Sequence, residues 1–262
     1  MAGDEIVYVA VAPRSTLDAD LIKAVAAIID KEPYDTRLLL SGEIPRIIAQ
    51  CSSVHEAESI AQGLRELGLV AIICEDLEFR KPLESFSAHT LEFQEGGVLF
   101  RDKSGRERRM GARDVFLILE GRIQTYIEEE TTKTRMKISW PATVLTGGIP
   151  IWRKVGEKAR ETFFQSEYFV RLYDRKPSEL SVELLQNHMN YSFLGTSMTF
   201  SSLTNFGAVV TKLREVFPQA VFDDRLMKSF GPSMPSTSVQ ADLEIKLRLI
   251  YLYHVAQRGL DR

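Results

Sequence analysis

The residue types that most often carry out catalysis or bind metals occur in this chain, but their spacing is not typical of such a site. The two cysteines do not form a Cys-x-x-Cys pair, and no two histidines have the His-x-x-x-His spacing of metal ligands on one helical face. Nucleophile-elbow and phosphate-loop motifs are also missing from the sequence. We therefore predict no catalytic residues, no metal and no cofactor. An enzyme whose active site is assembled from distant residues is an alternative.

Individual titratable residues are predicted to have structural positions. The histidines are widely separated in the sequence: His55, His89, His188 and His254. His55 is expected in the first exposed turn of a helix. Asp223 and Asp224 are adjacent carboxylates that a metal or acid-base site could use, but a solvated turn is the favoured interpretation.

A basic segment that contains both tryptophans is the predicted partner-binding surface. Residues 133–160 contain 7 Lys/Arg against 1 Asp/Glu, a net charge of +6, whereas residues 1–80 contain 7 against 14, a net charge of −7. Trp and Arg are favoured interface residues, and Gly147 with Gly148 could turn a long hairpin here. The alternative is a hairpin that folds back and buries both tryptophans. The candidate partner-binding residues are Lys133, Arg135, Lys137, Trp140, Trp152, Arg153, Lys154, Lys158 and Arg160.

Composition predicts an ordinary globular protein. Hydrophobic residues make up 44% of the 262 residues, charged residues make up 26%, and the net charge of −3 excludes a chain-wide basic field for nucleic acid. Cys51 and Cys74 lie in apolar runs and are expected to be core residues in a reducing compartment. No export leader or bilayer-spanning segment is evident, so we expect a soluble, cytoplasmic protein.

The first eighty residues alternate between strand and helix patterns. Apolar runs predict strands at 6–11, 46–51 and 70–74. The Ser15/Asp18 and Ser53/Glu56 pairs have the spacing of capping boxes and predict the starts of two helices. Pro33 should end the first of these helices, and Gly68 should end the second in the left-handed conformation. Residues 34–41 are either a short helix or a strand.

This element order resembles the C-terminal domain of the bacterial ribosomal stalk protein, a fold shared with the Clp protease adaptor. The likeness covers about residues 6–76. It depends on 21–25 in the first helix and on 53–58 leading to Leu67-Gly68 and the last strand. The stalk domain's Gly-Leu-Gly-Leu-Lys stretch is absent, because residues 31–35 read Lys-Glu-Pro-Tyr-Asp. The resemblance therefore implies a docking module but no binding residues.

From His89 onward, alternating patterns predict antiparallel strands. A hairpin is expected around residues 102–105, followed by strands at 114–123, 168–173, 180–184 and 189–194. A closing helix should bury one apolar face: Leu203, Phe206, Val210, Leu213 and Phe217. This order resembles a pleckstrin-homology-like barrel with an inserted arm at 124–164. That resemblance implies an anionic lipid surface as a further possible partner.

The C-terminal segment 242–255 fits two patterns. Strict alternation favours a strand, whereas Leu243, Leu247, Ile250 and His254 form a helical stripe, and we predict a helix after a linker at 229–238. Because the segment is apolar on more than one side, it should be buried between two packing surfaces. The second of these could be another copy of the chain.

The sequence thus predicts an α+β protein: a stalk-domain-like module at 1–80, an antiparallel barrel with its closing helix at 86–222, and a linker with a C-terminal helix at 223–262. The favoured function is a non-enzymatic, bacterial protein-interaction or assembly module, with a protein partner or self-association. Nucleic-acid binding through the basic segment is the alternative.

Overall fold

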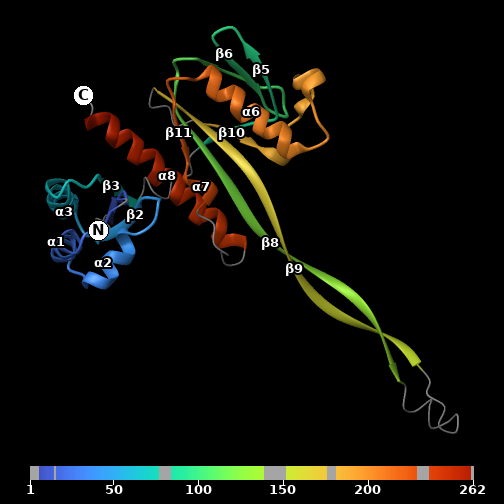
Figure 1. Cartoon of the computed structure of the whole chain (residues 1–262), viewed down its shortest axis with the longest axis horizontal. Helices are drawn as coiled ribbons and strands as arrows, with labels where there is room; N and C mark the ends of the chain where they lie inside the picture. The colour runs from blue at the N-terminus through green and yellow to red at the C-terminus, as the bar shows by residue number, and fades with distance from the viewer. Residues whose placement is uncertain are drawn as a thin grey trace, which may run out of the picture. The chain divides into compact units, whose positions relative to one another are not determined.

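The computed structural model describes residues 6–14, 16–76, 84–138, 152–175, 181–228 and 236–260. Side chains in the long elements are described only for 115–123, 166–174 and 242–259. The chain divides into two compact units, residues 1–123 with 167–262 and residues 124–166. Helices and three sheets occur together, which confirms the predicted α+β class (Figure 1). Among the described residues, no helix combines the length and hydrophobicity that crossing a bilayer requires.

The N-terminal elements follow the predicted order, and the undecided segment 34–41 is helical. The three strands form an antiparallel sheet in the order β2-β1-β3. The elements are β1 (Val7–Val11), α1 (Ala19–Ile29), α2 (Pro33–Leu40), β2 (Arg46–Cys51), α3 (Val54–Glu66) and β3 (Ala71–Glu75).

Local hydrogen bonds explain why the helices begin and end where they do. Asp18 is itself the N-cap of α1, because its side chain accepts from the Leu21 amide at 2.6 Å. The helix therefore starts later than the Ser15/Asp18 pair predicted, and Ser15 lies outside the described residues. Ser53 caps α3 by accepting from the Glu56 amide at 3.2 Å. The Glu56 carboxylate accepts from the Ser52 amide, and Gly68 follows α3 with φ +75°, as predicted. Cys51 and Cys74 are free and buried, which confirms that they are core residues.

The remaining strands form two open sheets among the described residues, so the predicted closed antiparallel barrel is wrong. One sheet has the order β11-β8-β9-β10-β4, and the other has the order β5-β6-β7. The five-stranded sheet is mixed, because β4 pairs in parallel with β10 and β11 pairs in parallel with β8. The strands are β4 (Ser85–Ala88), β5 (Thr90–Gln94), β6 (Gly97–Arg101), β7 (Glu107–Gly111), β8 (Val115–Ile138), β9 (Trp152–Asp174), β10 (Ser181–Leu185) and β11 (Val221–Asp224).

One predicted strand, 189–194, is instead helical. Residues Tyr191–Ser197 form the 3₁₀ segment η2, after the short 3₁₀ turn η1 (Gln186–His188). The Asn190 side chain accepts from the Ser192 amide at 3.0 Å and so starts the helical turn. Met189, Tyr191 and Leu194 are buried, so the segment is apolar as expected, but its backbone is helical. The predicted hairpin at 102–105 is confirmed, because β6 pairs with β7 in antiparallel register.

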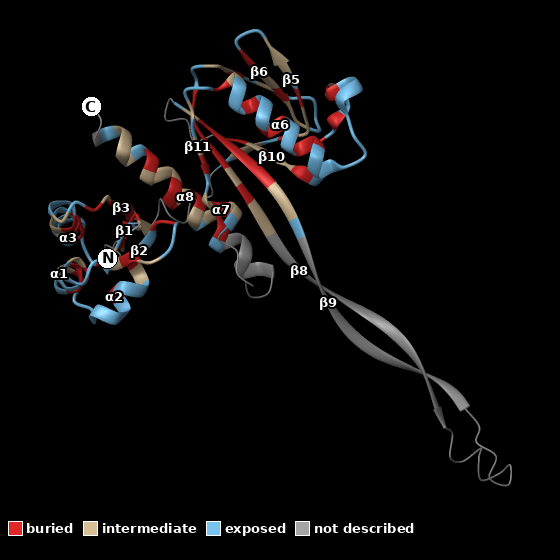
Figure 2. Cartoon of the chain, in the orientation of Figure 1, coloured by how far each residue is buried: buried red, intermediate tan, exposed pale blue. Residues whose placement is uncertain are grey.

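The two open sheets and the helix α6 (Ser202–Val216) share one hydrophobic core, which includes Phe100, Ile118, Leu172 and Phe206. Figure 2 shows α6 with one buried and one exposed face. Ser201 caps α6 by accepting from the Thr204 amide, and four residues of the predicted face are buried. Leu203 is the exception. It is 51% exposed, because it lies in the first turn of α6, where the helix enters from the surface.

The C-terminal segment is the helix α8 (Ser236–Leu260), as predicted. The predicted stripe of Leu243, Leu247, Ile250 and His254 is buried. The first three of these pack against Phe116, Leu119 and Phe169 of β8 and β9. Residues 236–238 of the predicted linker belong to α8, and 229–235 lie outside the described residues.

A second side of α8 is also covered by this chain. Leu249 is 3% exposed and packs against Ala10, Ile72 and Cys74 of the N-terminal sheet. Two apolar sides of α8 are therefore buried, one against β8–β9 and one against β1–β3 (Figure 1), whereas Ile245 and Val255 are exposed. The prediction that α8 is buried between two packing surfaces is correct. Both surfaces belong to this chain, so a second copy is not required as one of them.

A buried arginine also links α8 to the five-stranded sheet. Arg171 of β9 is 5% exposed. Its Nε donates to Glu183 of β10 at 2.7 Å, and its Nη1 donates to Glu244 of α8 at 2.9 Å. Burial would lower the pKa of Arg171, but the hydrogen bonds and charges of the two glutamates outweigh burial and raise it. Arg171 is therefore fully charged and fixes the orientation of α8.

We expect the substitution Arg171→Met to lower the free energy of unfolding by about 3 kcal/mol, because it leaves two carboxylates without their partner. This is the lower end of the ~3–5 kcal/mol typical of breaking a buried pair, since the Glu244 side chain is 33% exposed. Urea unfolding followed by circular dichroism measures the loss. Lys246→Met is the control: it removes the ion pair with the more exposed Asp242 and should cost less than about 0.5 kcal/mol. Equal losses for the two variants would contradict this role of Arg171.

Candidate interaction surfaces

The predicted partner-binding residues lie on or between the two longest strands. Strands β8 and β9 have 24 and 23 residues and are neighbours in one sheet. Residues 124–138 and 152–164 of the predicted insertion belong to these strands, and 139–151 lie outside the described residues. Lys133, Arg135 and Lys137 belong to β8. Trp152, Arg153, Lys154, Lys158 and Arg160 belong to β9. Trp140 and the side chains of the other eight lie outside the described residues, so their role in binding stays a prediction.

The expectation of a solvated turn at Asp223-Asp224 is wrong for Asp223. Both residues belong to β11, and Asp223 is 6% exposed. Its Oδ2 lies 2.7 Å from His254 Nε2 of α8, and Oδ1 accepts from Arg225 Nε at 3.0 Å. Arg225 also donates from Nη1 to the Glu43 carbonyl at 3.1 Å and lies over the Tyr253 ring. Because strand alternation turns Asp223 inward, Asp224 is exposed.

This cluster holds three parts of the chain together. Burial would raise the pKa of Asp223, but hydrogen bonds from His254 and Arg225 outweigh it and hold the pKa well below its usual range. The carboxylate is thus charged and occupied by its neighbours. From the sequence, His254 was predicted as part of the helical stripe of the C-terminal segment and was given no polar partner. No local motif joins it to Asp223, because the two residues are 31 positions apart. Their contact depends on how α8 packs.

The other histidines and the described acidic residues form no metal cluster. His55 is exposed, as predicted. His89 Nδ1 lies 2.5 Å from the His188 carbonyl, which fixes the ring against η1. Within the described ranges, no group of three or more His, Cys, Asp or Glu side chains could hold a metal ion.

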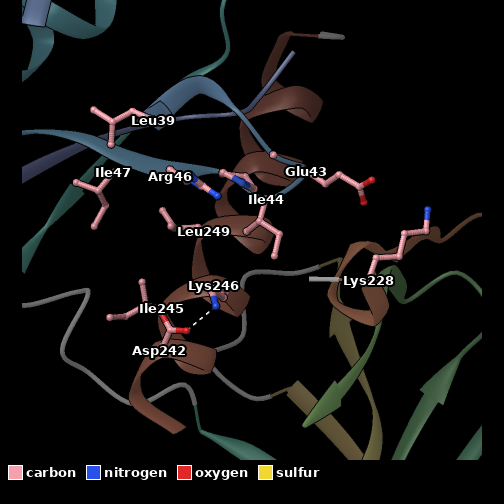
Figure 3. Close-up of a pocket in the computed structure, with 12 residues that line it drawn as sticks. Leu39, Glu43, Ile44, Arg46, Ile47, Lys228, Asp242, Ile245, Lys246 and Leu249 are labelled. Carbon is pink, nitrogen blue, oxygen red and sulfur yellow. Dashed lines mark hydrogen bonds and ion pairs between the residues drawn. The ribbon is translucent and has the colours of Figure 1, made fainter. Parts of the chain in front are cut away.

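A groove of about 670 Å³ is lined by the segment joining α2 to β2, by α7 (Arg225–Lys228) and by α8. Figure 3 shows an apolar wall from Ile44, Ile47, Ile245 and Leu249. Charged side chains surround this wall, including Glu43, Arg46, Lys228, Asp242 and Lys246. Lys246 pairs with Asp242 at 2.5 Å, and Arg46 donates to the Leu38 carbonyl at 2.9 Å. The mixed charges give the groove no strong preference for one sign of ligand.

Among the described residues of the C-terminal half, the most exposed large hydrophobic side chains lie from the end of η2 to the first turn of α6. Phe200 is 113% exposed, and Met198 and Leu203 are 52% and 51% exposed. We call residues 196–203 the apolar loop. Figure 2 shows the segment before α6 as largely exposed. Isolated exposed apolar residues are ordinary, whereas three large ones within six positions make this loop a candidate interaction surface.

Buried polar contacts hold the apolar loop in one conformation. Asn205 is 4% exposed. Its Oδ1 accepts from the Thr199 amide at 2.8 Å, and its Nδ2 donates to the Thr199 carbonyl at 2.8 Å. The Met198 amide donates to the Gly195 carbonyl, and Gln186 donates to Ser202 at 2.9 Å. Asn205 therefore fixes the position of Thr199. Met198 and Phe200, the chain neighbours of Thr199, are exposed.

Charge is absent from the sequence around the apolar loop. The 28 residues from Leu184 to Thr211 contain no Asp, Glu, Lys or Arg, although 26% of the chain is charged. Part of this run lies in the chain's own core, including Met189, Tyr191 and Phe206. Residues 195–203 are exposed, and there the absence of charge together with Phe200 and Met198 matches the composition of an interface centre. Sequence reasoning missed this surface, because it treated 189–194 as a strand and Leu203 as core. The uncharged run was the signal that could have found it.

Comparison with known proteins identifies no relative. The chain matches no protein-family model, and no match to it is found among curated proteins or solved structures. The resemblances of residues 6–76 to the stalk-domain fold and of the second part to a pleckstrin-homology-like fold therefore stay predictions from element order.

We expect Asp223→Asn to lower the free energy of unfolding by about 2 kcal/mol at pH 7, as for lost charge-assisted hydrogen bonds. The pKa of Asp223 is lower in the folded state, so its contribution is fully present above the unfolded value of about 3.9 and declines as the pH falls below it. The difference in the free energy of unfolding between wild type and Asp223→Asn, measured by urea titration, should thus become smaller below about pH 4. A difference that stays constant from pH 7 to pH 2 would contradict this. Asp224→Asn, at an exposed position, is the control at pH 7.

Proposed function

We propose that this chain is a non-enzymatic protein-interaction module that binds its partner through the apolar loop. The observation that supports the proposal is the full exposure of Phe200 on a loop fastened by a buried asparagine. A flexible loop would lose conformational entropy on binding, whereas a loop held by Asn205 loses little. An exposed aromatic side chain on such a loop has the properties of an interface hot spot.

The chemistry of the described polar clusters favours binding over catalysis. The buried carboxylate Asp223 is occupied by His254 and Arg225, and Glu244 is occupied by Arg171. These groups link α8 to its neighbours, so each has a structural role. An enzyme whose site is assembled from distant residues is an alternative to a binding module. Measured turnover of a substrate would contradict our proposal and support that alternative.

Nucleic-acid binding is the second alternative from the sequence. It depends on the basic residues of 133–160, whose side chains are outside the described residues, so it stays a prediction. The apolar loop does not favour nucleic acid, because phosphate contacts need Lys or Arg and none occurs between Leu184 and Thr211.

Site-specific photo-crosslinking tests the proposal. Phe200 is replaced by p-benzoyl-phenylalanine in the full chain, and the cells that make the protein are illuminated. We expect one discrete adduct of higher mass, because a bound partner covers the ring of residue 200. The control is the same replacement at Tyr34, an aromatic residue of α2 that is 73% exposed, and it should give no discrete adduct. Equal labelling at both positions, or no adduct at residue 200, would contradict the proposal.

A further inference from the structure

We propose that the partner of the apolar loop is a second copy of this chain, paired about a two-fold axis that passes beside Phe200. This inference rests on the proposed function and specifies its partner. In a two-fold interface the same patch occurs on both sides, so the patch must be complementary to itself. The apolar loop meets this requirement in charge and in hydrogen bonding, and its exposed apolar side chains supply contact area.

The charge of the apolar loop permits contact with its own copy. Near a two-fold axis each side chain lies close to its equivalent, so a charged residue would face a like charge, which is unfavourable. No charged residue occurs from Leu184 to Thr211. A partner of opposite charge would instead be favoured by charged residues on this loop, and residues 184–211 contain no Asp, Glu, Lys or Arg.

The polar side chains of the apolar loop are also self-complementary. A hydroxyl group both donates and accepts hydrogen bonds, so two identical hydroxyls can pair, whereas two carboxylates or two ammonium groups cannot. Thr196, Ser197, Ser201 and Ser202 are exposed around Phe200 and Met198. They can form a polar rim that meets its own copy without unsatisfied groups.

The exposed apolar side chains Met198, Phe200 and Leu203 supply the contact area for the second copy. With a two-fold axis beside Phe200, its ring can pack between Met198 and Leu203 of the other copy, and the reverse contact follows from symmetry. Aromatic rings pack favourably against Met sulfur. A fully exposed Phe with two half-exposed side chains offers roughly 350–400 Å² of apolar surface per chain. With the rim, the total approaches the ~1,200 Å² lower limit of a stable interface, so we expect a dissociation constant of roughly 1–100 μM.

A lipid surface is the other class of partner for an exposed Phe. Surface-binding segments of this kind combine apolar residues with Lys or Arg that attract anionic headgroups. The apolar loop has none of these basic residues. The observations therefore favour the second copy, and lipid becomes an outcome of the test.

The test is the solution mass of the purified full chain by sedimentation equilibrium between about 1 and 200 μM, which covers the expected range of dissociation constants. We expect wild type to change from the 29.7 kDa monomer to a species of twice that mass. Phe200→Ser should raise the dissociation constant at least about 30-fold, because each dimer loses the ring twice. Tyr34→Ser removes an exposed aromatic residue elsewhere and should leave the dissociation constant unchanged. Circular dichroism should show all three proteins equally folded, since residue 200 contacts little of its own chain.

A wild-type chain that stays monomeric at 200 μM overturns this inference, as does a dimer that Phe200→Ser leaves intact. If the wild-type chain is monomeric, two further measurements identify the ligand of the apolar loop. A monomer that still gives a discrete adduct from residue 200 in cells has a different protein partner, so the proposed function stands. A monomer that gives no such adduct, but sediments with phosphatidylserine-phosphatidylcholine vesicles only when Phe200 is present, binds lipid, and both proposals fail.

Discussion

The structure depends on burying a C-terminal helix that is apolar on more than one side. Leu243, Leu247 and Ile250 of α8 pack on β8 and β9, and Leu249 packs on β1 and β3. Neither the three-stranded N-terminal sheet nor the five-stranded sheet covers these side chains alone. Because burial of a large aliphatic side chain contributes about 1.5–3 kcal/mol, these four side chains make α8 a major link between the two sheets.

Polar contacts fix the orientation of α8, which the apolar contacts alone leave undetermined. Hydrophobic packing is not directional, whereas the Arg171 ion pairs and the Asp223-His254-Arg225 cluster each require a defined rotation of α8. The two clusters lie on β9 and on β11, so α8 is held to the five-stranded sheet at two places. Arg225 extends this network to the Glu43 carbonyl in the segment before β2. These contacts fix the sides of α8 that pack against the two sheets, whereas Phe200 of the apolar loop is fully exposed.

Local sequence signals predicted the elements but not how they combine. Ser53, Gly68 and the turn at 102–105 act through contacts a few residues apart, so their roles are evident from the sequence. The helical stripe of α8 was correct for the same reason. Asp18 was placed in the right region, but it caps α1 itself instead of following a cap at Ser15. The barrel was wrong because closure depends on pairing between distant strands, and parallel pairing of β4 with β10 has no local signal. Asp223 with His254 was missed because their contact arises only when α8 packs.

The apolar loop shows how a pattern can be present and still be misinterpreted. Met189, Tyr191 and Leu194 are buried where a strand was expected, and this assignment hid the exposed residues that follow. Asn205 was assigned no role because its partner Thr199 lies before the helix start. Composition over 184–211 was a better guide than periodicity, since the absence of charge does not depend on the secondary structure.

Hydrogen exchange as a function of urea tests the central claim, that α8 joins the two sheets into one cooperative structure. Peptide-level mass spectrometry follows β1–β3, α8 and β8–β10 in the same sample. If α8 joins them, the amides of all three regions lose protection in one transition at the same urea concentration. If β1–β3 lose protection at clearly lower urea while α8 and β8–β10 stay protected, the N-terminal sheet is independent of α8 and the claim is wrong.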